Sequence, residues 1–411
     1  MAVADLGDWL SAWLEEGSIW YLKRLSANDT LANETHQAGP YIPKDVLFEL
    51  FPELNRADQR NPDLHIDAYI DSHADYKRVR AIWYNNRLFG GTRNETRLTN
   101  WGGGASALLD PESTGALAVF AFTPRTETRP RDLHIWVCED PTQEDLVEER
   151  LSPVEPGEHL TWRPGRAEVQ RVLEMAAGNG APCRLTPAQM PPGWLTAFPT
   201  GADIVRKVCD LRPSYGLAPD ARLIRRRDCE FELFQAIEEA IEGGVITHGF
   251  HSVAEFLTHA QRILQRRKAR SGRSLELQTR EILIEEGLES GKDFSHQPES
   301  DRGKRPDFLF PSQRAYQDET FPAARLRFLA AKTTCKDRWR QIINEADRIP
   351  VKHLLTLQEG VSVTQYAEMK DAGVRLVIPD SLVPKFPETI RPELITLGDF
   401  IESVRHLKVL S

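Results

Sequence analysis

The spacing of apolar residues changes along the chain, from strand-like alternation in the first part to helical periodicity in the second. Up to about residue 140, short alternating or apolar runs are separated by turn residues, a pattern typical of β-strands. These runs are IWYLKRL, DLHIDAYI, VRAIWY, ALAVFAF and LHIWVC. The pattern predicts a mostly β domain, and we expect it to form a barrel.

Glycine and proline dominate the segment between about Ala176 and Gly193. Its sequence, AAGNGAPCRLTPAQMPPG, has little charge and no periodicity, which is typical of a linker between domains. Helical periodicity follows in CEFELFQAIEEAIEGG from Cys229 and in SVAEFLTHAQRILQRR from Ser252. From Phe308 onward helical segments alternate with apolar strands, so we expect a mixed or parallel sheet covered by helices.

Length and composition indicate a multidomain protein without membrane segments. A chain of 411 residues is long enough for two or three domains. It holds no apolar run of about 18 residues and no basic-then-apolar leader, so we expect neither a membrane span nor a secretory signal, and a cytoplasmic location. The cysteines are scattered, odd in number and without a CxxC pair, which predicts neither a zinc site nor a disulfide framework. They are Cys138, Cys183, Cys209, Cys229 and Cys335.

Between residues 307 and 345 the chain carries an acid, a lysine and a second acid in an order that suits metal-dependent phosphodiester hydrolysis. Asp307 lies in RPDFLF, Lys332 ends LRFLAAK 25 residues later, and Glu345 follows after 13 more. The first spacing suits neighbouring strands of one sheet, and the second places Glu345 on the next helix. Carboxylates are hard ligands for Mg²⁺, and a lysine beside the scissile phosphate stabilises developing charge. The ordinary alternatives are a turn-capping Asp307 and a solvated helix acid at Glu345.

The helix expected from Asp337 has two distinct faces. Its apolar residues, which include Trp339 and Ile342, form one stripe. Arg338 and Glu345 are seven residues apart, or two turns, so they share another face. One helix is therefore expected to present a DNA-reading arginine and a metal-binding glutamate in the same direction.

Charge is distributed unevenly along the chain. The formal net charge of −9 argues mildly against a nucleic-acid partner, although binding depends on local fields. Residues 262–273 hold six basic side chains and no acid, and residues 77–97 hold six against the single Glu95. One such segment is more often a solvated face than a binding surface. Because this chain has two such segments and a nuclease-like pattern, we expect both segments to face DNA, where each phosphate contact needs a cation.

Several segments together resemble the EcoRII-type restriction endonucleases. In the second half these are RRKARSGRSLEL, RPDFLFPS, AKTTCKDRWRQIINEADRI and HLLTLQEGVS, and in the first half YLKRLSANDT, TRNETR and STGALAVFAF. The resemblance covers essentially the whole chain. It implies a multidomain fold, with an N-terminal mostly β pseudobarrel DNA-binding domain and a C-terminal α/β PD-(D/E)xK nuclease core. We expect the effector domain at residues 1–177, a linker at 178–188 and the catalytic domain at 189–411.

The resemblance also implies roles for individual residues of the catalytic site. Asp307 and Lys332 match the motif aspartate and lysine, and Ala330 stands where common members of the superfamily carry the second acid. In this branch that acid is Glu345, so Asp307 and Glu345 are the expected metal ligands. Two further residues match active-site positions, namely Glu276 and Tyr316.

The residues expected to contact DNA fall into two sets. In the catalytic domain Lys336, Asp337 and Arg338 match the segment that reads C and G bases, and Arg227 and Lys268 are further expected contacts. In the effector domain the matching positions are Arg93, Glu95, Arg97, His36 and Tyr41. Gly91 and Thr96 stand where the relative has lysines, so the effector contacts differ in part from the family pattern.

The residue pattern predicts a Mg²⁺-dependent nuclease, and the resemblance implies a type II restriction endonuclease that cuts both strands of duplex DNA at a CCWGG-type site, W being A or T. By resemblance it is expected to be a homodimer, to be autoinhibited until a second site binds the N-terminal domain, and to be paired with a DNA methyltransferase. The alternative is a non-cleaving DNA-binding regulator with a decayed nuclease domain, against which the intact acid-lysine-acid set argues. A small-molecule α/β hydrolase is disfavoured because the chain has no GxSxG motif.

Overall fold

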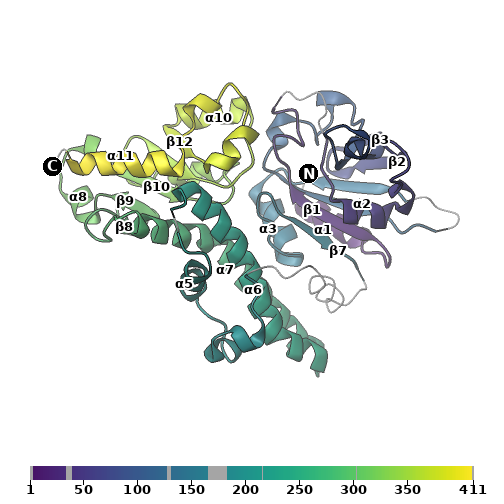
Figure 1. Cartoon of the computed structure of the whole chain (residues 1–411), viewed down its shortest axis with the longest axis horizontal. Coiled ribbons are helices and arrows are strands. Elements are labelled where there is room, and N and C mark those ends of the chain that lie inside the picture. The colour runs from purple at the N-terminus through teal and green to yellow at the C-terminus, as the bar shows by residue number, and fades with distance from the viewer. Residues whose placement is uncertain are drawn as a thin grey trace. The chain divides into compact units, whose positions relative to one another are not determined.

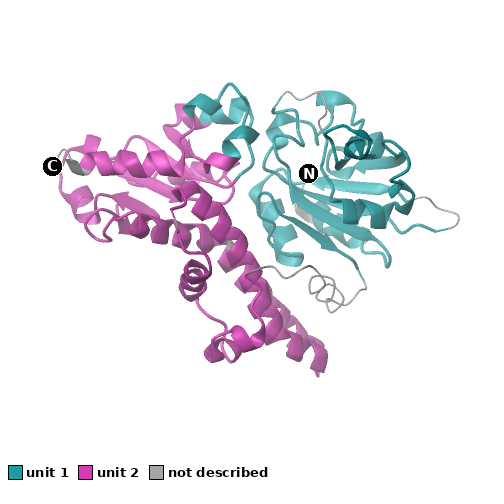
Figure 2. Cartoon of the chain, viewed as in Figure 1, with its two compact units in different colours: residues 1–165, 358–368, 382–393 teal, residues 166–357, 369–381, 394–411 magenta. Residues whose placement is uncertain are grey.

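The computed structural model describes residues 3–33, 39–126, 131–164, 183–214, 216–301 and 303–409. His36 and the first part of the predicted linker, through residue 182, lie outside these ranges. The chain forms two compact units, whose elements and residues are shown in Figures 1 and 2. The first consists of residues 1–165, 358–368 and 382–393, and the second of residues 166–357, 369–381 and 394–411. No helix among the described residues is both long and apolar enough to span a membrane.

The first unit is built on a seven-stranded, curled sheet with the order β4-β3-β2-β6-β5-β1-β7. All pairs are antiparallel except β2 with β6. The sheet is open, since β4 and β7 are its two edges, and this form agrees with the predicted pseudobarrel. The strands are β1 (Ile19–Arg24), β2 (Asp63–Ile70), β3 (Asp75–Tyr84), β4 (Glu95–Thr99), β5 (Leu117–Phe122), β6 (Leu133–Val137) and β7 (His159–Trp162).

Both faces of this sheet are buried. Alternate side chains of a strand point to opposite faces, so in β1 Tyr21 packs in one apolar cluster and Trp20 in another. The cluster around Tyr21 includes residues of α2, and the cluster around Trp20 includes residues of α1 and α3. The three helices are α1 (Val3–Ala12), α2 (Lys44–Leu50) and α3 (Pro141–Arg150). The central strands are therefore apolar on both sides, which explains their nearly continuous apolar sequences.

Two late segments of the chain belong to the first unit and pack against its sheet and loops. The backbone N–H of Ala27 donates to the carbonyl of Glu359 at 2.9 Å. The Ser362 hydroxyl donates to Glu112 Oε1 at 2.5 Å, and the Gln365 side chain donates to the Glu112 carbonyl at 3.0 Å. Residues 358–368, which follow the second sheet's β11 in sequence, are therefore held by polar contacts within the first unit.

The second unit holds a five-stranded mixed sheet with the order β12-β11-β10-β9-β8. Strands β10, β11 and β12 are parallel, while β8, β9 and β10 are antiparallel, as the predicted alternation of helices and strands allows. The strands are β8 (Ser295–His296), β9 (Phe308–Phe310), β10 (Arg327–Ala331), β11 (Lys352–Leu355) and β12 (Val374–Val377). The helices are α5 (Gly201–Leu211), α6 (Pro219–His248), α7 (Val253–Glu285), α8 (Gln313–Gln317), α9 (Trp339–Ile342), α10 (Val363–Asp371, shared with the first unit) and α11 (Leu397–Val409).

The basic run at residues 262–273 lies on α7 and faces acids on α6. Arg266 pairs with Glu242 at 2.7 Å, and Arg270 pairs with Glu230 at 2.6 Å. Arg267 in the same run pairs with an acid of α6 as well. These contacts pair three of the six basic side chains with acids of α6 and join the two long helices. Contact of the rest of the run with DNA stays a prediction.

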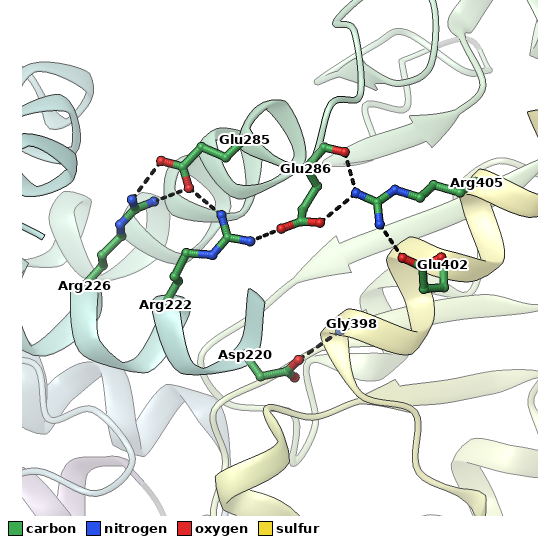
Figure 3. Close-up of polar contacts among 8 residues, drawn as sticks. All are labelled: Asp220, Arg222, Arg226, Glu285, Glu286, Gly398, Glu402 and Arg405. Atoms are coloured by element: carbon green, nitrogen blue, oxygen red, sulfur yellow. Dashed lines mark hydrogen bonds and ion pairs between the residues drawn. The ribbon is translucent and has the colours of Figure 1, made fainter. Parts of the chain in front are cut away.

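A second charged network fixes the other end of this helix pair to α11 (Figure 3). Arg226, which is 1% exposed, makes two hydrogen bonds to Glu285 at 2.7 and 2.9 Å. Arg222 bridges Glu285 and Glu286, and Arg405 of α11 donates to Glu286 at 2.6 Å. Asp220 accepts from the backbone N–H groups of Leu397 and Gly398, both at 2.9 Å, where α11 begins. The network holds the C-terminal end of α7 at a defined position in the second unit.

A disulfide joins Cys183 to Cys229 in the second unit. Both side chains are buried in the cluster that α5 and α6 form with Met190. The expectation that no cysteines are bridged was wrong, because pairing depends on distance in the fold and these two are 46 residues apart in sequence. Cys183 and Met190 thus anchor the described part of the Gly- and Pro-rich segment in the core of this unit.

Candidate active site and DNA-contact residues

The second sheet brings Asp307 and Lys332 together. Asp307 immediately precedes β9 and Lys332 immediately follows β10, and these strands pair antiparallel with Phe308 opposite Leu329. Asp307 Oδ2 accepts from the backbone N–H of Ala331 at 2.8 Å and lies 3.2 Å from Lys332 Nζ. Burial raises the pKa of Asp307, and the nearby lysine and N–H group act in the opposite direction. The strand spacing inferred from the sequence therefore produces the predicted contact.

Glu345 is not on a helix. Helix α9 ends at Ile342, and Glu345 lies in the irregular turn that follows, where Ala346 adopts φ 51°. The predicted helix through Glu345, with Arg338 on the same face, was therefore wrong. The carboxylate still belongs to the site. Burial and the neighbouring Asp307 raise the pKa of Glu345 to about 7, while three lysines oppose the shift.

Glu276 joins the site from α7 and brings a histidine that the sequence reasoning missed. Glu276 is 4% exposed, and its Oε1 forms a hydrogen bond with His296 Nε2. His296 lies on β8 opposite Phe308 of β9, so it stands beside the residue that follows Asp307. Glu276 in turn raises the pKa of Asp307 by repulsion, after the larger effect of burial. No local sequence pattern indicates that His296 lies in the site, because its strand, β8, has only two residues.

Tyr316 is buried beside the turn that follows Glu345. Its hydroxyl donates to Asp301 Oδ2 at 2.8 Å and accepts from the backbone N–H of Arg348 at 3.4 Å. Burial, reinforced by Asp301, raises the pKa of Tyr316 to about 12. A neutral hydroxyl at this position links the residue 301 loop to residue 348. A role for Tyr316 at the reacting phosphate stays a prediction.

The donor set suits a hard divalent cation. Burial is the main cause of the raised pKa values of Asp307 and Glu345, and repulsion adds to it, from Glu276 on Asp307 and from Asp307 on Glu345. A bound cation would remove that repulsion, and oxygen ligands are those that Mg²⁺ prefers. Among the described residues, however, no three Asp, Glu, His or Cys side chains converge as a preformed metal cluster.

The expected base-reading residues follow β10 within a few residues of Lys332. Lys336, Asp337 and Arg338 are all partly exposed just before α9, and Asp337 pairs with Arg340 at 2.7 Å. The segment thus leaves the catalytic strand at its C-terminal end and carries polar side chains that reach solvent. Arg227 on α6 and Lys268 on α7 are also partly exposed.

In the first unit, four of the expected effector contacts form one cluster. Glu95 accepts from Arg93 and lies 3.4 Å from Arg97, and these arginines lower its pKa although burial acts the other way. Arg93 also lies over the Tyr84 ring at 3.9 Å, and Tyr41 bridges to Arg97 through the backbone. The fifth predicted residue, His36, lies outside the described residues.

The Thr96 side chain points to the opposite face of β4 from the side chains of Glu95 and Arg97. Thr96 is fully buried, and its hydroxyl donates to the carbonyl of Ile42. Because side chains alternate along a strand, Glu95 and Arg97 point to the partly exposed face. The difference from the family at Thr96 therefore falls on an interior position and leaves the Arg93, Glu95 and Arg97 cluster intact.

Sequence comparisons match both halves of the chain. The "EcoRII C terminal" family matches residues 234–401, and "Restriction endonuclease EcoRII, N-terminal" matches residues 15–166. The Type II restriction enzyme EcoRII of Escherichia coli is 42% identical over 409 residues, 99% of each chain. The chain belongs to the EcoRII family of restriction endonucleases. It is thus a homologue of a site-specific deoxyribonuclease, and the predicted family, fold class and enzyme class are confirmed.

Two solved structures show more distant similarity to the EcoRII-family chain. Metal-depleted Ecl18kI in complex with uncleaved DNA is 20% identical with a TM-score of 0.43, and the match covers 54% of this chain and 86% of that one. The UbaLAI restriction endonuclease B3 domain with cognate DNA is 17% identical with a TM-score of 0.28, over 39% and 98% of the two chains. The family assignment depends on the sequence matches alone.

Proposed function

We propose that this EcoRII-family protein is a Mg²⁺-dependent type II endonuclease that cuts both strands of duplex DNA at a CCWGG-type site. The observation that carries the proposal is the contact of Asp307 with Lys332, with Glu345 close enough that repulsion contributes to its raised pKa. Paired carboxylates beside a lysine are the groups that metal-assisted phosphodiester hydrolysis needs. A decayed, non-cleaving regulator would have no reason to retain such an arrangement in a partly buried site.

Asp307 and Glu345 would hold the Mg²⁺, which when bound supplies a polarised phosphate and a hydroxide at neutral pH. Lys332 holds the Asp307 carboxylate at 3.2 Å and carries a positive charge toward the scissile phosphate, where it stabilises the charge that develops. Glu276, which is bonded to His296, would accept a hydrogen bond from the attacking water. The surrounding burial strengthens these electrostatic effects.

Recognition of the C·G pairs falls to the segment just before α9. Arginine and lysine bond the O6 and N7 atoms of guanine, and an acid accepts from the cytosine amino group, so Lys336, Asp337 and Arg338 are suited to CC and GG. A homodimer would supply two active sites, one for each strand of the pseudopalindromic site. A nuclease of this kind works in the cytoplasm beside a DNA methyltransferase that protects the host sites.

The cluster of Arg93, Glu95 and Arg97 would bind a second copy of the site and stimulate cleavage. Its two arginines and one carboxylate can contact guanine and cytosine edges in the major groove. Before that binding, we propose that the N-terminal domain restrains cleavage, so that a single site is cut slowly. Restraint of this kind prevents cleavage at isolated sites.

Incubation of the protein with methyl-free plasmid and Mg²⁺, followed by sequencing of the cut ends, tests the proposal directly. Defined double-strand breaks at CCWGG are expected, and they should disappear in Asp307→Asn. Specific binding without any cleavage would instead favour the regulator. Breaks at a different sequence would retain the nuclease but overturn the assigned site.

A further inference from the structure

Lys352, the first residue of β11, is a buried lysine close to the candidate site. Only 4% of its surface is exposed. Its Nζ donates to two backbone carbonyls, those of Ala346 and Ile349, each at 2.5 Å, and lies 5.4 Å from the centre of the Phe328 ring. Burying an ammonium group is costly unless it is well bonded, so these contacts define one position for the side chain.

The two carbonyls belong to the turn that carries Glu345. This turn follows α9 and is not a continuation of the helix; within it the Ala346 carbonyl accepts from the Ile349 N–H at 2.9 Å as well as from Lys352. Ala346 adopts φ 51°, a conformation unfavourable for any residue with a Cβ, and it persists only where the surroundings hold it. Lys352 supplies two of the bonds that hold it, and Asp301 supplies a third by accepting from the Asp347 N–H at 3.2 Å.

The lysine also lies among the charged groups of the site. Asp347, Asp301 and Glu345 attract its ammonium, and Lys304 repels it. In the same way Lys352 favours the ionised form of Glu345. Strand β11 continues next to β10, and the backbone N–H of Lys332 donates to the carbonyl of Leu355 at 2.9 Å. Strand β11 therefore begins at Lys352 and, at its last residue, Leu355, bonds the backbone of the catalytic Lys332.

We propose that Lys352 is a positioning residue for DNA hydrolysis: its ammonium fixes the turn at residues 345–349, so that the Glu345 carboxylate is held where it meets the metal with Asp307. The proposal rests on the proposed function, in which Glu345 is a metal ligand. Residues that orient ligands typically change metal affinity or activity by about 10- to 100-fold when mutated.

The test compares Lys352→Met with Lys304→Met in the full chain. Both changes remove one lysine charge near Glu345, but Lys304 is partly exposed and bonds Asp347 rather than backbone carbonyls. Cleavage of a CCWGG plasmid is measured across a Mg²⁺ titration, with folded fraction and metal-free duplex binding measured in parallel. For Lys352→Met we expect the Mg²⁺ concentration for half-maximal cleavage to rise about tenfold with duplex binding retained. For Lys304→Met, which removes a nearby charge but leaves both carbonyl bonds of Lys352 in place, we expect a clearly smaller rise.

An unchanged Mg²⁺ midpoint in folded Lys352→Met would overturn the proposal, and equal shifts in both variants would overturn it too, because charge alone would then explain the effect. If Lys352→Met does not fold, Lys352→Gln decides, because a shorter, neutral amide weakens the two carbonyl bonds while keeping a donor. A raised midpoint in Lys352→Gln supports the proposal and an unchanged one refutes it. Failure of the wild-type protein to cleave would instead refute the proposed function.

Discussion

The two candidate DNA-binding regions differ in how far their charged groups are removed from water. In the first unit the Arg93 and Glu95 side chains are each about 30% exposed, at 29% and 30%. In the second unit the Asp307 side chain is 13% exposed and that of Glu276 only 6%. Exposed groups can meet base edges at little cost. Burying a carboxylate costs desolvation free energy, and a bound cation at a catalytic site can offset that cost.

The pKa shifts follow the same division. Arg93 and Arg97 lower the pKa of Glu95, so this acid stays ionised and can accept hydrogen bonds over the whole physiological range. Burial and Asp307 raise the pKa of Glu345 to about 7. Perturbed carboxylates of this second kind are typical of catalytic sites. The comparison favours effector-site recognition at the first region and chemistry at the second.

The largest effect is expected for Lys332→Ala. Loss of a group that stabilises developing charge should lower the cleavage rate by at least about 100-fold, while metal-free duplex binding stays intact. Plasmid cleavage and gel-shift assays measure the two quantities. Lys292→Ala removes an exposed lysine of the same unit and serves as the matched control. Cleavage by Lys332→Ala at the control rate would show that the site is misplaced.

Arg338→Ala should affect recognition more than chemistry. Loss of a bidentate contact to guanine should cost about 1–3 kcal/mol of discrimination at a G·C pair. Binding is measured on the CCWGG duplex, on single-substitution duplexes and on a random duplex. An equal loss on all of them would make Arg338 a phosphate contact.

Glu95→Gln should weaken only the effector response. Replacing the charged acceptor between two arginines should cost about 1 kcal/mol, or near fivefold in the affinity for a stimulating duplex. The measurement is the concentration of an uncleavable site-containing duplex that gives half-maximal stimulation. Unstimulated cleavage of a one-site plasmid should not change, and a fall in that rate would contradict the division between the two regions.

The smallest effect is a pH dependence at limiting Mg²⁺. Glu345 has a raised pKa of about 7, so its ionised form increases as pH rises through that value and its protonated form prevails below it. Because a protonated carboxyl cannot bind the cation, cleavage should fall about threefold between pH 7.5 and 6.5. At saturating Mg²⁺ the decrease in the cleavage rate should occur at a lower pH. A rate that rises on acidification would contradict the ligand role.

The part of the site that depends on neighbouring strands was predictable. Asp307 and Lys332 end up together because one precedes β9, the other follows β10, and hairpin-like pairing brings such positions side by side. The polar contacts of α7 with α6 were also accessible in principle, since the acids of CEFELFQAIEEAIEGG recur at helical spacing before the basic run. Neither segment alone indicates that the basic residues of α7 pair with the acids of α6.

The features that depend on distant residues were not predictable. Helix α9 ends at Ile342, and in the turn that follows Lys352 bonds the Ala346 carbonyl while Asp301, 46 residues away, accepts from the Asp347 N–H. His296 meets Glu276 across 20 residues, and Cys183 meets Cys229 across 46. Local helix propensity favoured the continuation through Glu345, and tertiary hydrogen bonds overruled it.

The most direct test of this division of labour is the cleavage rate of a one-site, unmethylated plasmid as an uncleavable duplex containing the site is added. The wild-type rate should rise with the added duplex. Arg97→Ala should stay at the unstimulated rate, and Lys332→Ala should not cut at any duplex concentration. Stimulation of Arg97→Ala at wild-type duplex concentrations, or cleavage by Lys332→Ala, would contradict the assignment of recognition to one region and chemistry to the other.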